Sequence, residues 1–393
     1  MIESFYIAWK YVTYNKLKTV ILIACITLIA FLPLGLQRLL TESEQQLLSR
    51  AVSTPLIVGA KGSALDLVMN TLYFGDQVPE LISMADSQAL MDSDLALPVP
   101  VYVRFRARGH AIVGTTLDYF DFRSLKVAEG RGLAVLGDCV VGATVAKRLG
   151  LAPGDSLISS PDNLFDLAGV YPLKMRVAGV LEKAHTSDDL AIFVDLKTAW
   201  IIEGLGHGHE DITKTQDSTV ILSRTETNVV ANAKLEQYTE ITEANLDSFH
   251  FHGNTSHYPI SAVIALPRDA KAGTILRGRY LSTDAINQIA RPKDVIDELL
   301  QNIFRIKNVL DAVVGLVGLA TVLAVVLVFA LSLRLRQREI STIFKLGCSR
   351  MTIARLLGAE IFIIVLISGV LSLAMMAVLS QFANDLVRAL FIR

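Results

Sequence analysis

Three long runs of apolar residues interrupt the chain, and each is long enough to cross a membrane as a helix. The runs cover residues 19–37, 312–333 and 361–382. About 20 apolar residues, rising 1.5 Å each, span the roughly 30 Å hydrocarbon core of a bilayer. The first run is too long for the apolar part of a secretory signal, and it ends without a small-x-small cleavage site. We therefore predict three transmembrane helices, of which the first is a retained anchor.

Basic residues beside these runs predict which ends face the cytoplasm, because cytoplasmic loops are enriched in lysine and arginine. Lys10, Lys16 and Lys18 precede the first run. The loop between the second and third runs carries Arg334, Arg336, Arg338, Lys345, Arg350 and Arg355. Residues 38–311 are therefore expected outside the cytoplasm. The tail 383–393 then lies outside as well, although Arg388 and Arg393 oppose that position.

The roughly 270 residues between the first two runs are predicted to form an α+β domain. Alternating or β-rich stretches predict strands at 56–58, 99–105, 111–115, 175–180, 191–194, 219–222 and 260–265. Helical patterns predict helices at 138–149 and 229–238. A domain of this size lies where single cores tend to divide, so we expect two lobes.

Apolar residues just before the second run repeat at heptad spacing. They are Ile296, Leu299, Ile303, Ile306, Leu310 and Val313. Steps of three and four residues predict one long helix whose packed seam continues into the membrane. Because residues 39–51 extend the first run outward in the same way, we interpret the two helices as a lever that moves the external domain. The alternative is that both helices are only structural supports.

The loop 334–357 is predicted to form two short cytoplasmic helices. Ile340, Ile343, Phe344 and Leu346 form the apolar face of the first helix. Gly347 suits the left-handed residue after a helix, and Ser349 suits the cap of the next one. The simpler interpretation is a solvated basic loop that follows the charge rule of membrane proteins.

The pattern Arg338-Glu339-Ile340 followed by Lys345-Leu346-Gly347-Cys348-Ser349-Arg350 resembles the coupling segment of the MacB/LolE/FtsX superfamily of ABC-transporter permeases. In that family the segment docks on a separate ATPase subunit, which binds ATP and Mg²⁺. The resemblance therefore implies that the coupling residues are Arg338, Glu339, Ile340, Lys345, Gly347, Ser349 and Arg350.

Short pieces of the external domain also resemble the MacB-type periplasmic core, and they occur in family order. They are Gly59-Ala60-Lys61-Gly62-Ser63 with Leu65-Asp66-Leu67-Val68, Val113-Gly114-Thr115-Thr116, Glu129-Gly130-Arg131, Val177-Ala178-Gly179-Val180-Leu181 and Phe249-His250-Phe251-His252-Gly253. This resemblance implies an α-helical membrane protein with a large α+β two-lobed periplasmic domain inserted between the first and second transmembrane helices.

The predicted organisation follows from the apolar runs and the resemblance together. It comprises an N-terminal cytoplasmic helix at 1–18, transmembrane helices at 19–38, 312–333 and 358–382, and a periplasmic domain at 39–311. Within that domain the membrane-proximal lobe covers about 50–119 and 217–290, the inserted lobe about 120–216, and the stalk helices 39–52 and 292–311. The coupling loop covers 334–357 and the tail 383–393.

Composition limits the chemistry that this chain performs. The hydrophobic fraction is 52% and the net charge is −1, and no basic patch interleaved with aromatic residues suggests nucleic-acid binding. The sequence has no phosphate-binding loop, no GxSxG elbow and no HExxH zinc motif, so we expect no catalysis and no bound cofactor. Cys25, Cys139 and Cys348 are interpreted as packing residues.

The seven histidines all fall in the external domain. His207, His209, Glu210 and Asp211 lie together in a glycine-containing loop, and neutral imidazole and carboxylate are ligands that suit zinc. His250 and His252 are predicted on one face of a strand. The loop is therefore a candidate zinc site, and the alternative is a solvated surface turn.

Two classes of function compete with the leading hypothesis. That hypothesis is a dimeric permease subunit in the bacterial inner membrane that uses hydrolysis on a partner ATPase to export or extract a substrate. An adaptor, an outer-membrane channel and membrane lipid are further partners that the family suggests. The alternatives are an FtsX-like signalling subunit and a zinc-handling envelope component. The family usually has four spans, so a three-span variant or a truncated sequence is expected.

Overall fold

A computed structural model of the protein divides into two compact units, which are described separately. One unit comprises Met1–Gln46 and Leu299–Phe391, and the other comprises Leu47–Glu298. The structure describes residues 2–160, 172–208, 221–224, 229–231, 239–281, 285–335 and 349–391, together with residues 337, 341, 342 and 345.

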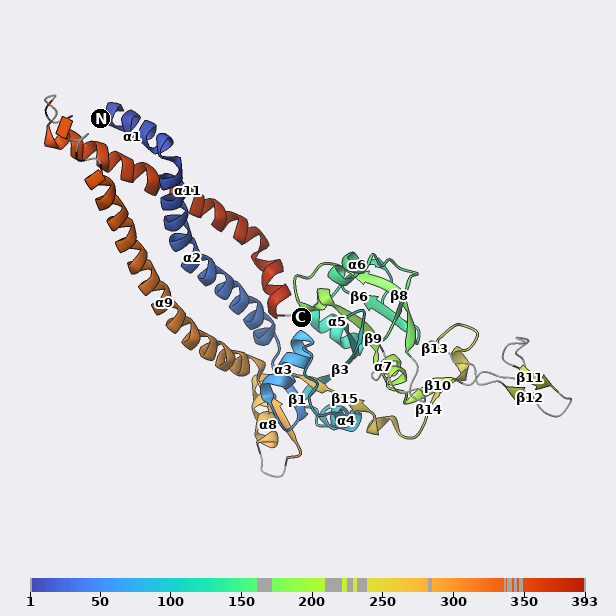
Figure 1. Ribbon diagram of the computed structural model, residues 1–393. Helices are drawn as coiled ribbons and strands as arrows, with labels where there is room; N and C mark the ends of the chain where they lie inside the picture. The colour runs from blue at the N-terminus through green and yellow to red at the C-terminus, as the bar shows by residue number, and fades with distance from the viewer. Residues whose placement is uncertain are drawn as a thin grey trace. The chain divides into compact units, whose positions relative to one another are not determined.

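The first unit is all-helical (Figure 1). Its elements belong to α1 (Ile2–Tyr14), α2 (Lys16–Ser53), α9 (Pro292–Leu335) and α11 (Arg350–Phe391). The helices α1 and α11 pack together, with the Phe5 and Phe362 rings edge to face at 5.9 Å. Small polar residues join α2 to α11, where Thr27 Oγ1 donates a hydrogen bond to the Ser368 carbonyl oxygen at 3.4 Å.

Two of the helices in the described residues are long and apolar enough to cross a membrane, over Lys16–Leu39 and Met351–Phe382. The second predicted span, 312–333, lies inside α9, where the apolar stretch among described residues is Asp311–Ala320. Glu360 is buried near the start of the second candidate span and lies 3.5 Å from Lys18 Nζ, so its charge is compensated within the helical unit.

The second unit is built on a mixed sheet of eleven strands. The strand order is β13-β8-β6-β9-β4-β3-β16-β1-β17, and β5 and β7 pair with β8. The strands are β1 (Leu56–Ala60), β3 (Ala96–Ala107), β4 (His110–Thr115), β5 (Val127–Gly130), β6 (Asp138–Val141), β7 (Ser156–Ile158), β8 (Leu173–Leu181), β9 (Ala191–Asp195), β13 (Thr239–Glu240), β16 (Ala262–Pro267) and β17 (Asn287–Ala290). The predicted strands at 56–58, 99–105, 111–115, 175–180 and 191–194 are thereby confirmed.

Three small ribbons accompany the main sheet. They are β2 (Ile82–Ser83) with β15 (Pro259–Ile260), β10 (Gly206–Gly208) with β14 (Phe249–Phe251), and β11 (Ile221–Arg224) with β12 (Val229–Ala231). The predicted strand at 260–265 is divided at Ser261, because Ile260 pairs with β2 whereas β16 pairs with β3.

Short helices surround the sheet. They are α3 (Ala64–Tyr73), α4 (Met84–Asp92), α5 (Leu117–Arg123), α6 (Ala143–Leu149), α7 (Leu196–Ile202) and α8 (Ala270–Tyr280), with 3-10 turns η1 (Ser187–Leu190), η2 (Leu246–Ser248) and η3 (Thr255–His257). Side chains cap the starts of α3 and α7: Ser63 accepts a hydrogen bond from the Asp66 amide, and Asp195 accepts from the amides of Lys197 and Thr198.

Two predicted helices are wrong in part. Residues 138–141 form the buried strand β6, and the helix α6 starts only after Gly142. Gly142 lies so close to the backbone of η1 that a Cβ there would come within 2.3 Å of the Asp188 carbonyl oxygen, which ends the strand at a tight turn. The predicted helix at 229–238 begins instead as β12, because the β-branched Val229 and Val230 pair with β11.

The two predicted lobes share one sheet. Strand β4, from the first predicted lobe, pairs in parallel with β9, from the predicted insertion, so that Ala111 lies opposite Ala191. Because backbone hydrogen bonds continue through this pair, residues 47–298 form one compact unit and not two separate sheets.

Candidate functional sites

A buried ion pair holds the last turn of α2 inside the mixed unit. Arg50 Nη1 and Nη2 donate hydrogen bonds to the two carboxylate oxygens of Asp188, at 2.5 and 2.8 Å. The Tyr119 hydroxyl donates to the same carboxylate at 2.8 Å and accepts from Arg50 Nη2 at 2.8 Å. Arg50 is only 5% exposed and Asp188 only 1%, so the pair is shielded from water. A forked contact of this kind fixes orientation as well as distance.

The sequence around each partner explains how the pair forms. Asp188 lies in η1, and Thr186 caps that turn by accepting a hydrogen bond from the Asp188 amide. Tyr119 lies in α5, and Arg50 lies four residues before Thr54, whose hydroxyl donates back to the Arg50 carbonyl oxygen at 2.9 Å. Three segments far apart in the chain therefore meet at one carboxylate.

The electrostatics of the pair favour the charged form of both partners. Burial alone would raise the pKa of Asp188, but the adjacent Arg50 guanidinium outweighs it and holds the pKa below its usual range. Burial alone would lower the pKa of Arg50, and the Asp188 carboxylate holds it above its usual value. Burial raises the pKa of Tyr119, so its hydroxyl keeps its proton. The cluster is an ion pair at neutral pH.

Further contacts surround the same turn of α2. The Tyr73 hydroxyl donates to the Leu47 carbonyl oxygen at 2.5 Å, and the Phe74 ring lies 5.4 Å from the Arg50 guanidinium. Arg123 donates to the hydroxyls of Ser53 and Thr54, at 3.1 and 2.8 Å. The segment 47–54 is therefore held by side chains from α3, α5 and η1. Sequence reasoning missed this anchor, and the available signal was a single arginine near the end of the predicted stalk helix 39–52.

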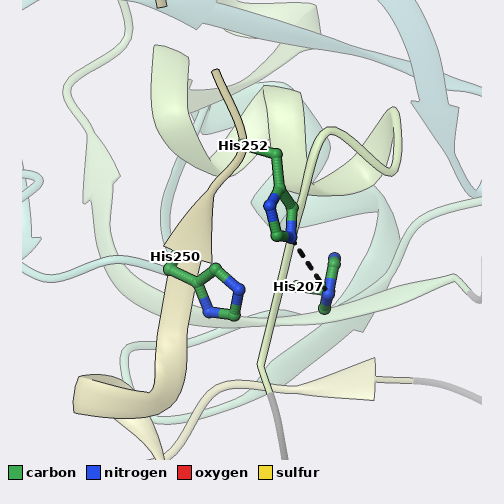
Figure 2. A group of neighbouring side chains, drawn as sticks. All are labelled: His207, His250 and His252. Carbon is green, nitrogen blue, oxygen red and sulfur yellow. Dashed lines mark hydrogen bonds between the residues drawn. The ribbon is translucent and has the colours of Figure 1, made fainter. Parts of the chain in front are cut away.

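A second site brings three histidines together on the ribbon β10–β14. His207 lies directly opposite His250 in the antiparallel register, and His252 follows two residues later (Figure 2). Nε2 of His207 and Nε2 of His252 are 3.4 Å apart. The three ring centroids are separated by 4.7 to 5.1 Å. His207 and His252 are exposed, and His250 is half-buried.

The residues between these histidines explain their common face. Phe249 and Phe251 alternate with the histidines and pack against the apolar core of the unit. Opposite them, a Cβ at Gly206 would come within 2.6 Å of the Phe251 ring, and one at Gly208 within 2.8 Å of the Phe249 ring. Glycine on both sides of His207 therefore makes room for the phenylalanine rings, which turn the imidazoles to the opposite face.

Of the four residues in the predicted zinc site, this cluster contains only His207. His207 belongs to the cluster, whereas its predicted co-ligands His209, Glu210 and Asp211 lie outside the described residues. The structure brings His207 to His250 and His252 instead. The strand alternation predicted for His250 and His252 was the available signal, but their pairing with His207 depends on the ribbon register.

The coupling and seam residues are described only in part. Ser349 Oγ accepts a hydrogen bond from the Thr352 amide at 3.2 Å and so caps α11, as its position predicts. Lys345 is helical and exposed, and Arg350 begins α11, whereas Arg338, Glu339, Ile340 and Gly347 lie outside the described residues.

Of the predicted heptad seam, Ile296 is fully buried, Leu299 is half-buried and Val313 is exposed. The side chains of Ile303, Ile306 and Leu310 lie outside the described residues.

Comparison with known protein families identifies the class of this chain. The family model of the MacB-like periplasmic core domain matches residues 19–245, which is more than half of the chain. The matched region begins in the first apolar run and contains most of the mixed sheet. No curated protein sequence gives a significant match.

Solved structures of related domains are similar at low identity. The periplasmic region of MacB from Actinobacillus actinomycetemcomitans is 13% identical over 66% of this chain and 99% of that structure, with a TM-score of 0.35. The extracellular domain of the noncanonic ABC-type transporter YknZ from Gram-positive bacteria is 13% identical over 60% of this chain and 99% of that structure, with a TM-score of 0.32. A domain of a putative permease protein from Porphyromonas gingivalis is 12% identical over 60% of this chain and 85% of that structure, with a TM-score of 0.27.

All three TM-scores are below 0.5, so the assignment rests on the family model. That model confirms the resemblance drawn from the short domain pieces between residues 59 and 181. The chain belongs to the ABC-transporter permease family whose members carry a MacB-like periplasmic core domain.

Proposed function

We propose that this chain is the permease subunit of a MacB-type ABC transporter, and that it passes motion driven by a partner ATPase to its periplasmic domain. The observation that carries the proposal is the anchor at Arg50. The helix α2 contains a candidate membrane span and ends in a turn that a buried ion pair fixes to the mixed unit. A helix held in this way transmits displacement of its other end, because a packed helix shifts as a body.

Exposed apolar surface on the helical unit supports its placement in the bacterial inner membrane. Leu327 is 69% exposed and Leu373 is 71% exposed within the single chain. Surface of this kind is favourable against lipid or against a second copy of the chain and unfavourable against water. The proposal therefore includes a homodimer with the domain 47–298 in the periplasm. A periplasmic adaptor and an outer-membrane channel are the further partners expected for export.

The coupling contact is assigned to the loop before α11. Glu339 and the turn from Lys345 to Arg350 are proposed to bind the ATPase, since the loop is charged and is the largest predicted cytoplasmic surface. Ser349 supports this, because its cap fixes where α11 starts and hence where the loop ends. ATP and Mg²⁺ belong to the partner in this proposal.

Replacing Gly347 by valine is expected to disrupt coupling. A β-branched residue in the left-handed conformation costs about 1 kcal/mol or more, so the predicted turn would be distorted. ATP hydrolysis by the purified complex should lose its dependence on the permease, while the amount of permease in the membrane stays normal. Gly358→Val is the matched control, because Gly358 lies in α11 with no atom near its missing Cβ. Equal ATPase activity in Gly347→Val, Gly358→Val and the parent would contradict the coupling role.

The signalling alternative predicts a different result in the same complex. An FtsX-like subunit would activate an envelope enzyme and would move no substrate. The match to the MacB-like core over residues 19–245 supports the transport class over that alternative. Transport of a candidate substrate into or out of proteoliposomes, measured with ATP present, decides between them.

A further inference from the structure

Three imidazoles converge on the ribbon β10–β14 at spacings that suit a metal ion. Two ligand atoms that are each about 2.0–2.1 Å from a tetrahedral zinc ion lie about 3.3–3.4 Å apart. Nε2 of His207 and Nε2 of His252 are separated by 3.4 Å. The ligand atoms of all three histidines lie within 4.8 Å of one another. A movement of the third imidazole by about 1–2 Å therefore completes a zinc-sized triangle.

The proton positions of His250 also suit a ligand. Nδ1 of His250 lies 3.0 Å from the Ser248 carbonyl oxygen. A carbonyl oxygen only accepts, so Nδ1 carries the proton in this contact and the lone pair of the ring is at Nε2. In known metal sites a histidine ligand usually donates its other ring N–H to a carbonyl or carboxylate, which fixes the ring orientation. His250 has that second contact with the last residue of η2, directly before its strand.

The backbone that presents the histidines is held in place. The Tyr258 hydroxyl lies 2.8 Å from the His252 carbonyl oxygen, directly after β14, and 3.2 Å from the Leu205 carbonyl oxygen, directly before β10. The Tyr258 ring meets the Trp200 ring edge to face at 5.1 Å. Ligands on a braced ribbon lose less conformational entropy on binding than ligands on an unconstrained loop.

We propose that His207, His250 and His252 bind one Zn²⁺ ion through their imidazole nitrogens. Imidazole favours borderline divalent ions such as Zn²⁺ over Mg²⁺ and Ca²⁺, which prefer oxygen. Three protein ligands leave one coordination position for water or for a donor atom of another molecule. Because His207 and His252 are exposed, that position faces solvent. The site is independent of the proposed transport role, since none of its residues belongs to the coupling segment or the seam.

The test uses the full chain in detergent, without a polyhistidine tag, and Zn²⁺ alone as the probe. Competition with a chromophoric chelator is expected to show one zinc ion per chain, with no competition by Mg²⁺ or Ca²⁺. His207→Ala, His250→Ala and His252→Ala should each weaken zinc binding by about 100-fold or more, since even loss of an outer partner of a ligand costs 10–100-fold. His257→Ala, an exposed histidine of η3 outside the cluster, should leave the affinity unchanged.

X-ray absorption of the zinc-loaded parent gives a readout that does not depend on folding of the variants. The expected first shell contains three imidazole nitrogens at about 2.0–2.1 Å. No zinc binding by the parent, or binding that survives in His250→Ala and His252→Ala, would overturn the proposal. Loss of binding confined to His207→Ala and His209→Ala would also overturn it, since the ion would then belong to the loop predicted from the sequence.

Discussion

Arg50→Met is expected to lower the free energy of unfolding of the mixed unit by about 3–5 kcal/mol, the usual cost of breaking a buried pair from one side. The substitution keeps much of the volume but leaves the Asp188 carboxylate buried without its cation. Tyr119 still donates to that carboxylate, but a neutral donor does not replace a guanidinium. For a unit of this size the loss corresponds to a fall of roughly 6–20 °C in melting temperature.

Calorimetry of the full chain in detergent at pH 7 measures this effect. Arg268→Met is the control, because the pair of Arg268 with Asp94 is exposed and such pairs contribute at most about 1 kcal/mol. The double variant Arg50→Met/Asp188→Leu should recover much of the loss, since it removes the unpaired charge. An equal, small effect for Arg50→Met and Arg268→Met would show that the Arg50 contact does not anchor α2.

The pH of that measurement matters because the pKa of Asp188 is lowered in the folded protein. A lowered pKa means that the unfolded chain binds the proton more readily than the folded one. The stabilising contribution of Asp188 is therefore complete above about pH 4, the usual pKa of aspartate, and disappears as the pH falls through the lowered value. At pH 7 the full effect of Arg50→Met is present.

Ile303→Asp is expected to separate ATP hydrolysis from movement of the periplasmic domain. Ile303 is the third position of the predicted seam, in which the described first position, Ile296, is fully buried. An unpaired carboxylate in a packed seam costs several kcal/mol or forces the helices apart. The complex should continue to hydrolyse ATP, while nucleotide-dependent changes in the periplasmic domain are lost.

Asn302→Asp provides the control for this prediction. It introduces the same carboxylate one residue earlier in α9, at an exposed position outside the seam. The readout is protection of the mixed unit from protease, with and without ATP, beside the rate of ATP hydrolysis. Should Ile303→Asp behave like Asn302→Asp in both measurements, the seam does not transmit motion.

Local patterns predicted much of the fold. Alternating apolar residues identified β3, β4, β8 and β9, and the apolar runs identified the helices α2 and α11. The strand β6 was missed because residues 138–149 were interpreted as one helical pattern. In the structure the Asp138 carboxylate accepts hydrogen bonds from Arg131 and Arg176. A short strand followed directly by a helix gives one mixed sequence pattern. The boundary between β6 and α6 lies at Gly142, which closely approaches the backbone of Asp188.

The two sites depend on pairings that a single sequence does not contain. Arg50 and Asp188 are 138 positions apart and meet only when η1 lies against the end of α2. The clustering of His250 with His252 follows from strand alternation, but the third histidine comes from β10 through the register of the ribbon. The sequence therefore indicated the kind of ligand. The predicted co-ligands His209, Glu210 and Asp211 were chosen because they are the neighbours of His207 along the chain, whereas the register of the ribbon adds His250 and His252.

The central claim is that ATP hydrolysis on the partner moves the periplasmic domains of two permease copies. The most direct test measures the distance between spin labels at Lys61→Cys, an exposed turn after β1, in the complex with its ATPase. Cys25 and Cys348 are replaced beforehand, and Cys139 can remain, because it is fully buried and burial raises the pKa of its thiol to about 12. The mean distance should shift by several ångströms between the nucleotide-free and the ADP–vanadate-trapped complex. Identical distance distributions in the two states, in a complex that hydrolyses ATP, would contradict the account.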